Sequence, residues 1–151
     1  MLIQIDDLST SDIRSLLAFH VADLQQKSPS ESCYVLDITS LQKPEVTVYA
    51  ARDNDQLLGC AALKELSPTT GEIKSMRTAP EHLRKGVART LLQHLIIQAR
   101  ERKYEKLYLE TGVDEAFSQA RTLYLKSGFE YCGPYGGYVA RGPNCFMKFE
   151  L

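Results

Sequence analysis

The feature that most constrains the fold is a long amphipathic helical pattern between two strand-like runs in the middle of the chain. From Gly86 to about Arg102, apolar residues recur at three- and four-residue steps, which places them on one face of a helix. The residues on that face are Val87, Ala88, Leu91, Leu92, Leu95, Ile96 and Ala99. The run "EIKSMRTAP" precedes this helix and ends at Pro80, and the run "KLYLETG" follows it. Strand, helix and strand in this order are typical of a sheet covered by helices.

The flanking segments extend this pattern of strands and helices. Near the N-terminus, "LIQIDD" is a predicted strand, residues 8–29 form a predicted helix that Pro29 closes, and residues 30–44 are expected to hold a short second helix. The runs "VTVYAA" and "LLGCAALKEL" flank the turn sequence "RDNDQ" and predict a β-hairpin. Later, "DEAFSQARTLYLKSGF" is a second amphipathic helix, and "FEYC" and "CFMKFEL" are predicted strands.

The predicted element order is β-α-(α)-β-β-β-α-β-α-β-β. Alternation in the middle with hairpins towards the ends predicts an α/β fold with a mixed sheet and helices on both faces. A length of 151 residues favours a single domain over residues 1–151, since neither a linker nor an internal repeat interrupts the pattern.

Charge and cysteine content narrow the function classes. The formal net charge is -1, from 18 basic and 19 acidic residues, so neither nucleic acid nor an anionic membrane is favoured as a general partner. Without a run of about 18 apolar residues, no membrane span is predicted. The cysteines, Cys33, Cys60, Cys132 and Cys145, lack metal-ligand spacing, so no metal site is expected and a cytoplasmic location with reduced thiols is predicted.

Anion binding is nevertheless expected at one local site, the stretch "HLRKGVARTLL" at the start of the central helix. Backbone N–H groups in the first turn of a helix lack intrahelical partners, and the helix dipole makes that end positive. Gly86 and Ala88 permit close approach, and Arg84, Lys85 and Arg89 add charge. The stretch therefore predicts a cradle for a phosphate or pyrophosphate. A solvated helix start remains the alternative. The string GxxxxGK[ST] does not occur, and "GPYGGY" lies in the wrong context for a dinucleotide fingerprint.

Together with "LYLETG", "ARTLYLKSGFEYCGPY" and "FMKFEL", this region resembles the GNAT acetyltransferase family. The resemblance covers nearly the whole chain and is strongest over residues 71–132. It implies the three-layer α/β/α acyl-CoA N-acyltransferase fold and acetyl-CoA as co-substrate. Of the family loop Arg/Gln-x-x-Gly-x-Gly/Ala, Gly86 and Ala88 fill the last two specified positions, whereas Leu83 replaces the first. Phe117 stands where the later helix of the family often has Asn.

The resemblance also implies which residues hold acetyl-CoA. Backbone N–H groups of the loop would bind the pyrophosphate, and the edge of the preceding strand would pair with the pantetheine arm. The implied contacts are Met76, Thr78, Leu83, Arg84, Lys85, Gly86, Val87, Ala88 and Arg89.

Two catalytic roles follow from the same resemblance. Tyr124 in "LYLKSGF" matches the family's acid, which protonates or stabilises the leaving thiolate. A phenol pKa of ~10 lies above the ~8.5 of a thiol, so proton donation is not strongly driven, and a hydrogen bond to the thiolate would help without full transfer. Glu72 matches a base position, acting directly or through water, and Glu110 is the reserve candidate. The alternatives are a core tyrosine at position 124 and, for Glu72, a strand-end glutamate that faces solvent or pairs with Lys74.

The acceptor is expected to be a small amine or an amino-acid-like molecule. Arg77 and Arg141 are candidates for binding a carboxylate, and Tyr138 is a candidate for stacking or hydrogen bonding. The first helix, residues 28–35 and the loop at 135–144 are candidate pocket walls. Alternatives are acetylation of a protein lysine or N-terminus, a non-catalytic acyl-CoA sensor and, more remotely, an ATP or NAD binder. "CFMKFEL" as an exposed edge strand would permit a homodimer.

Overall fold

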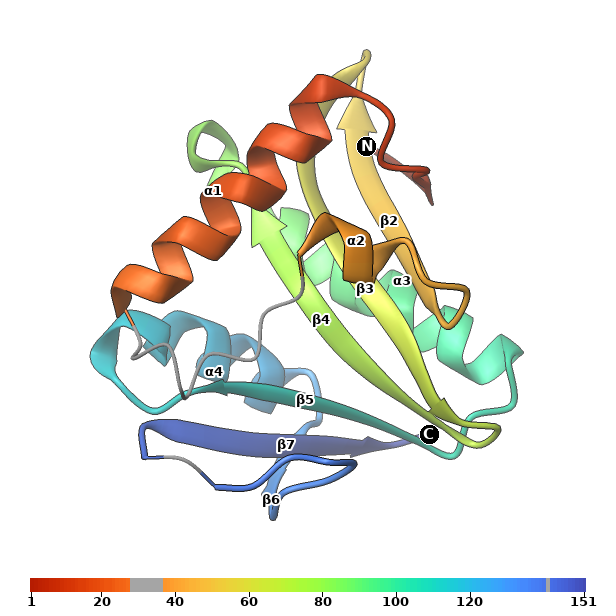
Figure 1. The fold of residues 1–151 in the computed structure, drawn as a ribbon, viewed down its shortest axis with the longest axis vertical. Helices are drawn as coiled ribbons and strands as arrows, with labels where there is room; N and C mark the ends of the chain where they lie inside the picture. The colour runs from red at the N-terminus through yellow and green to blue at the C-terminus, as the bar shows by residue number, and fades with distance from the viewer. Residues whose placement is uncertain (28–36, 141) are drawn as a thin grey trace.

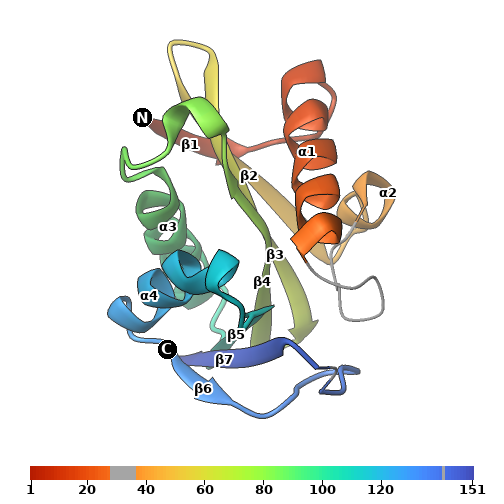
Figure 2. The ribbon, with the colours of Figure 1, turned by 90° about the vertical axis from the view of Figure 1, so that its left-hand side faces the viewer.

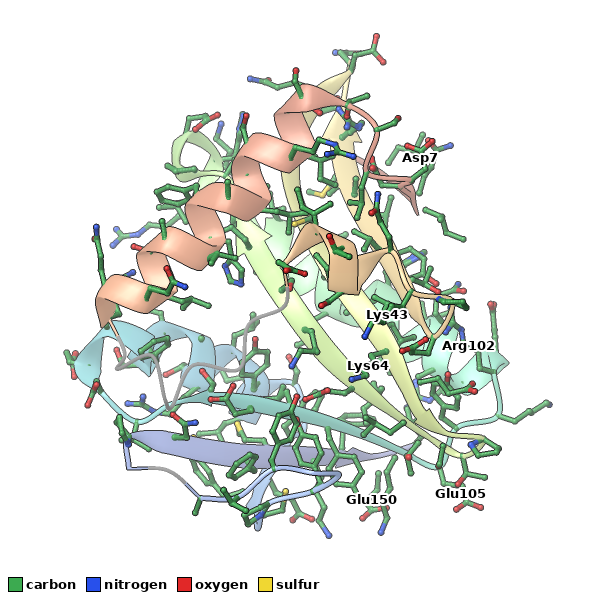
Figure 3. The ribbon with its side chains drawn as sticks, viewed as in Figure 1. Asp7, Lys43, Lys64, Arg102, Glu105 and Glu150 are labelled. Atoms are coloured by element: carbon green, nitrogen blue, oxygen red, sulfur yellow. The ribbon has the colours of Figure 1, made fainter. Side chains whose placement is uncertain are left out.

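The computed structural model describes residues 1–27, 37–140 and 142–151, in which helices cover both faces of a seven-stranded sheet (Figures 1 and 2). Pro29, Cys33 and Arg141 lie outside the described residues, as does the candidate pocket wall at 28–35. Glu105 and Glu150 lie at the bottom of the view, near the C-terminus, whereas Lys43 and Lys64 lie further up (Figure 3). Among the described residues, no helix combines the length and the apolar character that crossing a membrane requires.

The sheet is mixed, as predicted. Its strands are β1 (Leu2–Ile5), β2 (Val46–Asp53), β3 (Gln56–Ser67), β4 (Thr70–Thr78), β5 (Lys106–Gly112), β6 (Glu130–Cys132) and β7 (Asn144–Glu150). They lie in the order β1-β2-β3-β4-β5-β7-β6. Only the β4–β5 pair is parallel among these strands, because α3 (Val87–Glu101) carries the chain back between them.

The helices divide between the two faces of the sheet. Helices α1 (Ser11–Lys27) and α2 (Ile38–Leu41) cover one face, and α3 and α4 (Ser118–Lys126) cover the other (Figure 2). Two short 3-10 turns, η2 (Pro80–His82) and η3 (Glu115–Phe117), precede α3 and α4. The predicted element order, including the short second helix, is therefore confirmed, and so is the α/β fold with helices on both faces.

Each face of the sheet has its own apolar core. The buried residues of α3, such as Leu91 and Leu95, pack with Leu63 of β3 on one face. Ile13 of α1 packs with Ala62, also of β3, on the other face. Side chains alternate along a strand, so neighbouring residues of β3 supply the two cores. Because each β3 residue belongs to one core or the other, the residue of a neighbouring strand that pairs with it can be assigned to the same face.

The parallel pairing of β4 with β5 is short. Only Thr70–Glu72 pair with Lys106–Tyr108 among the described residues, and beyond them the two strands diverge (Figure 1). The edge of β4 from Ile73 to Thr78 is left without a neighbouring strand on this side. The divergence opens the sheet in the middle of the molecule, between the two helical layers.

A β-bulge in β4 decides where the side chains of the diverging segment point. Lys74 pairs with Ala62 and Arg77 with Cys60, so Ser75 and Met76 together lie opposite the one residue between them in β3. Ser75 has a φ of 52°. The extra residue resets the alternation, so that Met76 packs on the α3 side, whereas Arg77 faces α1.

The expectation that "CFMKFEL" is an exposed edge strand is wrong. This segment forms β7, which lies between β5 and β6. The cause is the three-residue strand β6, which follows α4 and returns to pair with Phe146–Lys148 of β7. A dimer through an open β7 edge is therefore not supported.

The α3 core should supply a large share of the stability. Leu92 has no exposed surface, so Leu92→Ala removes buried apolar contacts and leaves a cavity. We expect the free energy of unfolding to fall by about 2–5 kcal/mol, measured by chemical denaturation.

Ile97 of the same helix provides the matched control because 51% of its surface is exposed. We expect Ile97→Ala to change the free energy of unfolding by no more than about 0.5 kcal/mol. Equal losses in the two variants would contradict the packing described for α3.

Candidate active site

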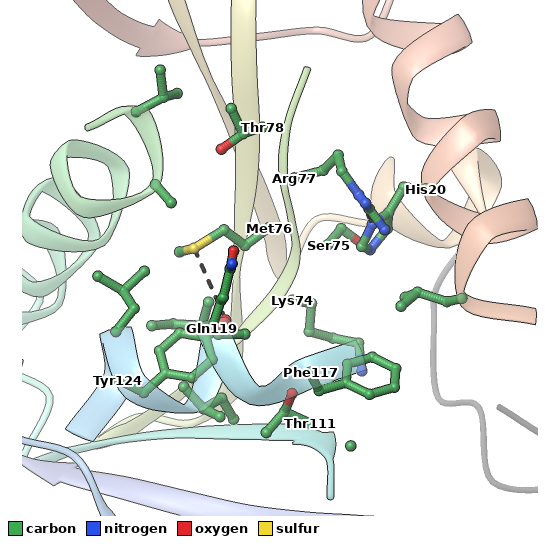
Figure 4. A pocket seen from close by; sticks show the side chains of 18 of the residues that line it. His20, Lys74, Ser75, Met76, Arg77, Thr78, Thr111, Phe117, Gln119 and Tyr124 are labelled. Atoms are coloured by element: carbon green, nitrogen blue, oxygen red, sulfur yellow. Dashed lines mark hydrogen bonds between the residues drawn. The ribbon is translucent and has the colours of Figure 1, made fainter. Parts of the chain in front are cut away.

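A cavity of about 500 Å³ occupies the divergence of β4 and β5. Residues of α1, β4, the loop before α3, the start of α3, β5, η3 and α4 line it (Figure 4). The lining includes most of the predicted site residues: Glu72, Met76, Arg77, Thr78, Leu83, Arg84, Gly86, Val87, Ala88, Arg89 and Tyr124. Lys85 and Tyr138 are not part of the lining, and Arg141 lies outside the described residues. The structure thus brings together segments that are far apart in the sequence.

The loop before α3 borders one end of the cavity. Gly86 is the N-cap of α3 with a φ of 80°, and no side chain caps the helix. The first-turn N–H groups after it have no intrahelical partners, which leaves donors for an anion. The Nζ atom of Lys85 lies 3.1 Å from Nδ1 of His82 and so turns back towards η2. The loop accordingly offers backbone donors together with Arg84 and Arg89 at the cavity wall.

Tyr124 reaches the cavity from α4 and is almost fully buried. Its hydroxyl lies 4.0 Å from Sδ of Met76 (Figure 4). Burial, together with the nearby carboxylate of Glu110, raises the pKa of Tyr124 to about 12. The phenol is therefore protonated at neutral pH and can donate a hydrogen bond into the cavity.

Glu72 is 1% exposed, and both of its carboxylate oxygens are engaged. The hydroxyl of Tyr135 donates to Oε2 at 2.6 Å and the hydroxyl of Tyr138 donates to Oε1 at 3.2 Å. Lys74 adds an ion pair at 3.6 Å and also donates to the hydroxyl of Tyr138 at 2.7 Å. The pairing with Lys74 was a predicted alternative, whereas the contact with Tyr135 was not predicted, because Tyr135 lies in a Gly- and Pro-rich segment with no regular period.

Glu110 lies at the end of β5 and also lines the cavity. Burial raises its pKa to about 7; Lys74 opposes this rise and Glu72 adds to it. Among the described residues, no side chain or backbone group donates a hydrogen bond to its carboxylate. Glu110 thus has a free carboxylate whose charge changes near neutral pH, a property suited to general base catalysis.

The strand registers place these groups on two faces of the sheet. Glu72, Lys74 and Arg77 pair with β3 residues that face α1, and Tyr108 of β5 shares that face through its stacking on Tyr135. Glu110 lies two residues after Tyr108, so it has the same orientation. Met76 and Tyr124 approach from the α3 and α4 side (Figure 4). The carboxylates and the phenol therefore meet at the divergence from opposite faces.

Arg77 connects β4 to α1. Its Nε donates to Nδ1 of His20 at 2.8 Å, and a terminal nitrogen donates to Asp23 at 2.8 Å. His20 also lines the cavity. The first helix was a predicted pocket wall, but His20 was not among the predicted site residues. Its spacing of three residues from Asp23, on the same face of α1, was the signal available.

Known proteins resemble this chain in sequence and in fold. The model of the acetyltransferase (GNAT) family matches residues 13–129. The uncharacterized N-acetyltransferase YsnE of Bacillus subtilis (strain 168) is 46% identical over 151 residues, with all of both chains covered. A protein of Klebsiella pneumoniae, provisionally assigned as an acyl-CoA N-acyltransferase, superposes with a TM-score of 0.81 at 25% identity, over 99% of this chain and 97% of that one.

A GNAT family acetyltransferase of Elizabethkingia anophelis, solved with acetyl-CoA bound, shares the fold. The TM-score is 0.71 at 21% identity, with 99% of this chain and 97% of that chain covered. The fold and the family match together define an acyltransferase of the acyl-CoA-dependent class. The chain belongs to the GNAT acetyltransferase family. It is an N-acetyltransferase that uses acetyl-CoA.

The left-handed conformation of Gly86 should matter for coenzyme A binding. A side chain at a φ of 80° costs about 1–2 kcal/mol, and the loop would shift to relieve that cost. We expect Gly86→Ala to weaken coenzyme A binding by roughly tenfold, measured by isothermal titration calorimetry.

Gly133→Ala is the matched control, because a Cβ there also meets open space and its φ does not require glycine. We expect this variant to bind coenzyme A with the affinity of the wild type. Identical dissociation constants for Gly86→Ala and wild type would show that the loop conformation is not needed for binding.

Proposed function

We propose that this enzyme acetylates the primary amine of a small, amino-acid-like acceptor by direct attack of the amine on the thioester. The observation that carries this proposal is a cavity in which carboxylates and a protonated phenol meet from opposite faces of the sheet. Acetyl-CoA supplies the activated acetyl group. The protein residues bind both substrates, accept one proton and donate another.

The donor is held along the α3 and α4 side in this proposal. Backbone N–H groups between Leu83 and Ala88 bind the pyrophosphate, with Arg84 and Arg89 adding charge at the wall. The free edge of β4 near Met76 and Thr78 pairs with the pantetheine arm as an added strand would. Val87 lines the same stretch of wall, whereas Lys85 contributes only through its backbone, since its side chain turns to His82.

The proton of the attacking amine goes to Glu110 in this proposal. An alkylammonium has a pKa of ~10, so the acceptor is mostly protonated at neutral pH. A base near the attacking nitrogen is therefore needed to accept the proton that this nitrogen loses. Glu110 lines the cavity with a pKa of about 7 and a free carboxylate. Both oxygens of Glu72 already accept hydrogen bonds from tyrosines. We therefore assign Glu72 the role of positioning Lys74 and sustaining the raised pKa of Glu110, in place of the base role expected from the sequence.

The leaving sulfur receives its stabilisation from Tyr124. As the C–N bond forms and the C–S bond breaks, the sulfur takes the electron pair of the broken bond, and the phenol donates a hydrogen bond to the thiolate or transfers its proton. A tyrosinate formed by such a transfer regains a proton from solvent. The products are an N-acetylated amine and free coenzyme A, and the proton lost by the amine resides on Glu110. A sensor without turnover would not require this pairing of a base with an acid.

A pH profile separates Glu110 from the other groups. Glu110 accepts a proton only when it is deprotonated, so its contribution to kcat/KM should rise with pH up to about 7 and flatten above it. We expect Glu110→Gln to lose this limb and to lower kcat by about 100-fold or more. The ionisation of the amine adds the same slope to both enzymes, so the ratio of the two profiles isolates Glu110.

Glu105→Gln, at an exposed position just before β5, is the control and should keep the wild-type profile. The variant Glu72→Gln completes the comparison. Retention of the limb in Glu110→Gln, with its loss in Glu72→Gln, would return the base role to Glu72.

The role of Tyr124 is tested with acetyl-CoA and a panel of amino acids, polyamines and peptides, by following thiol release. We expect release only when an amine is present, and a fall in kcat of about 100-fold in Tyr124→Phe with little change in the KM for acetyl-CoA. Tyr131→Phe, on the exposed strand β6, should match the wild type.

Tight binding of acetyl-CoA without turnover on any acceptor would instead support a sensor. Turnover on peptides alone would favour a protein acceptor. Equal kcat values for Tyr124→Phe and wild type would remove Tyr124 from the mechanism.

A further inference from the structure

Arg77 is fixed in place at the α1 side of the cavity but retains unused hydrogen-bonding capacity. Its side chain is only 18% exposed, and it is clamped by His20 and Asp23 through Nε and one terminal nitrogen. A guanidinium carries five N–H donors. Among the described residues, the other terminal nitrogen has no hydrogen-bond partner, and Arg77 lines the cavity. A preorganised cation therefore borders the space on the acceptor side.

His20 adds a neutral donor beside Arg77. Its Nδ1 accepts the hydrogen bond from Nε of Arg77, so its hydrogen is on Nε2. Burial and the adjacent Arg77 lower the pKa of His20 to about 3, which keeps the ring neutral. Within the described part of the chain, Nε2 makes no hydrogen bond, and it is not among the buried atoms that lack a partner. The N–H is therefore accessible from solvent, on a residue that lines the cavity.

The charges on the α1 face of the cavity separate into two groups. Arg77 and Lys27 both pair with Asp23, which gives this group a net positive charge. Among the residues that line the cavity nearer the pairing of β4 with β5, Glu72 and Glu110 outnumber Lys74, which gives this second group a net negative charge when Glu110 is ionised. Figure 4 shows Arg77 and His20 together towards α1, with Lys74 further along β4.

We propose that the acceptor is a zwitterion, an amine that also carries a carboxylate, and that Arg77 and the Nε2–H of His20 bind this carboxylate. The proposal rests on the proposed function and deepens it, because the amine then lies at Glu110 while the carboxylate lies at the cationic group. The single net positive charge of Arg77, Lys27 and Asp23 matches one carboxylate. Asp23 is a positioning residue that holds the guanidinium in its orientation.

The same charges disfavour acceptors that carry only positive groups. A polyamine long enough to fill the cavity places a second ammonium near Arg77, where like charges repel. A lysine side chain of a protein offers an amine but no carboxylate at the required end. The site therefore selects against acceptors that lack a carboxylate, since such an acceptor leaves Arg77 partly unpaired.

Matched acceptors test this proposal on the full-length enzyme with acetyl-CoA. One series contains glycine, β-alanine, 4-aminobutyrate and the standard amino acids; the second contains the corresponding amides and the amines without the carboxyl group. We expect kcat/KM for the best amino acid to exceed that of its amide and its amine by about 100-fold, because a buried charged hydrogen bond is lost.

Variants then locate the discrimination. Arg77→Gln and His20→Leu should lower kcat/KM for the amino acid by about 10- to 100-fold without lowering the value for the matched amine, whereas Arg77→Lys should recover part of the loss. Arg100→Gln, at an exposed position on α3, is the control with wild-type values. Thermal denaturation and acetyl-CoA affinity report whether a variant still folds.

Three outcomes would overturn the proposal. Amines or amides that are acetylated as fast as the amino acid would show that no carboxylate is recognised. An equal fall for both acceptors in Arg77→Gln would assign Arg77 only to the packing of α1. Absence of turnover on every acceptor would overturn the proposed acetyl transfer itself, whereas turnover without discrimination would overturn only the carboxylate site.

Discussion

The site depends on the short parallel pairing of β4 with β5. The two strands share hydrogen bonds only over Thr70–Glu72 and Lys106–Tyr108 and then diverge, so the sheet opens at its centre instead of continuing as a closed surface. This opening creates the cavity, frees one edge of β4 and leaves Glu110 at the end of β5 beside it. Further pairing of these strands would fill the space in which the donor and acceptor have to meet.

The β-bulge at Ser75 complements this divergence. It directs Met76 towards Tyr124 and Arg77 towards α1, while the regular alternation that precedes it keeps Lys74 on the face of Glu72. The same strand thereby supplies residues to both sides of the opening. In our proposal the α3 and α4 side holds acetyl-CoA and the leaving sulfur, and the α1 side holds the amine. With this separation, the amine gives its proton to Glu110 on one side of the sheet, and the sulfur receives its hydrogen bond or proton from Tyr124 on the other side.

The spacing of apolar residues predicted the element order, because burial of one face of a helix or strand leaves a repeat in the local sequence. The apolar face of α3 and the hairpin of β2 and β3 illustrate this. The order of β6 and β7 was not predictable, since it depends on which of two short strands pairs with β5. Tyr135 and Glu72 are 63 residues apart and meet through an irregular segment, so their hydrogen bond has no local sequence signal. The direction of Lys85 likewise depends on its contact with His82.

The most direct test of this account is a crystal structure of the enzyme with coenzyme A bound. We predict that the diphosphate lies against the backbone N–H groups from Leu83 to Ala88, that the pantetheine arm follows the free edge of β4, and that the sulfur lies near the hydroxyl of Tyr124. A diphosphate bound elsewhere, or a pantetheine arm that enters from the α1 side, would contradict the assignment of the two faces and the catalytic roles derived from it.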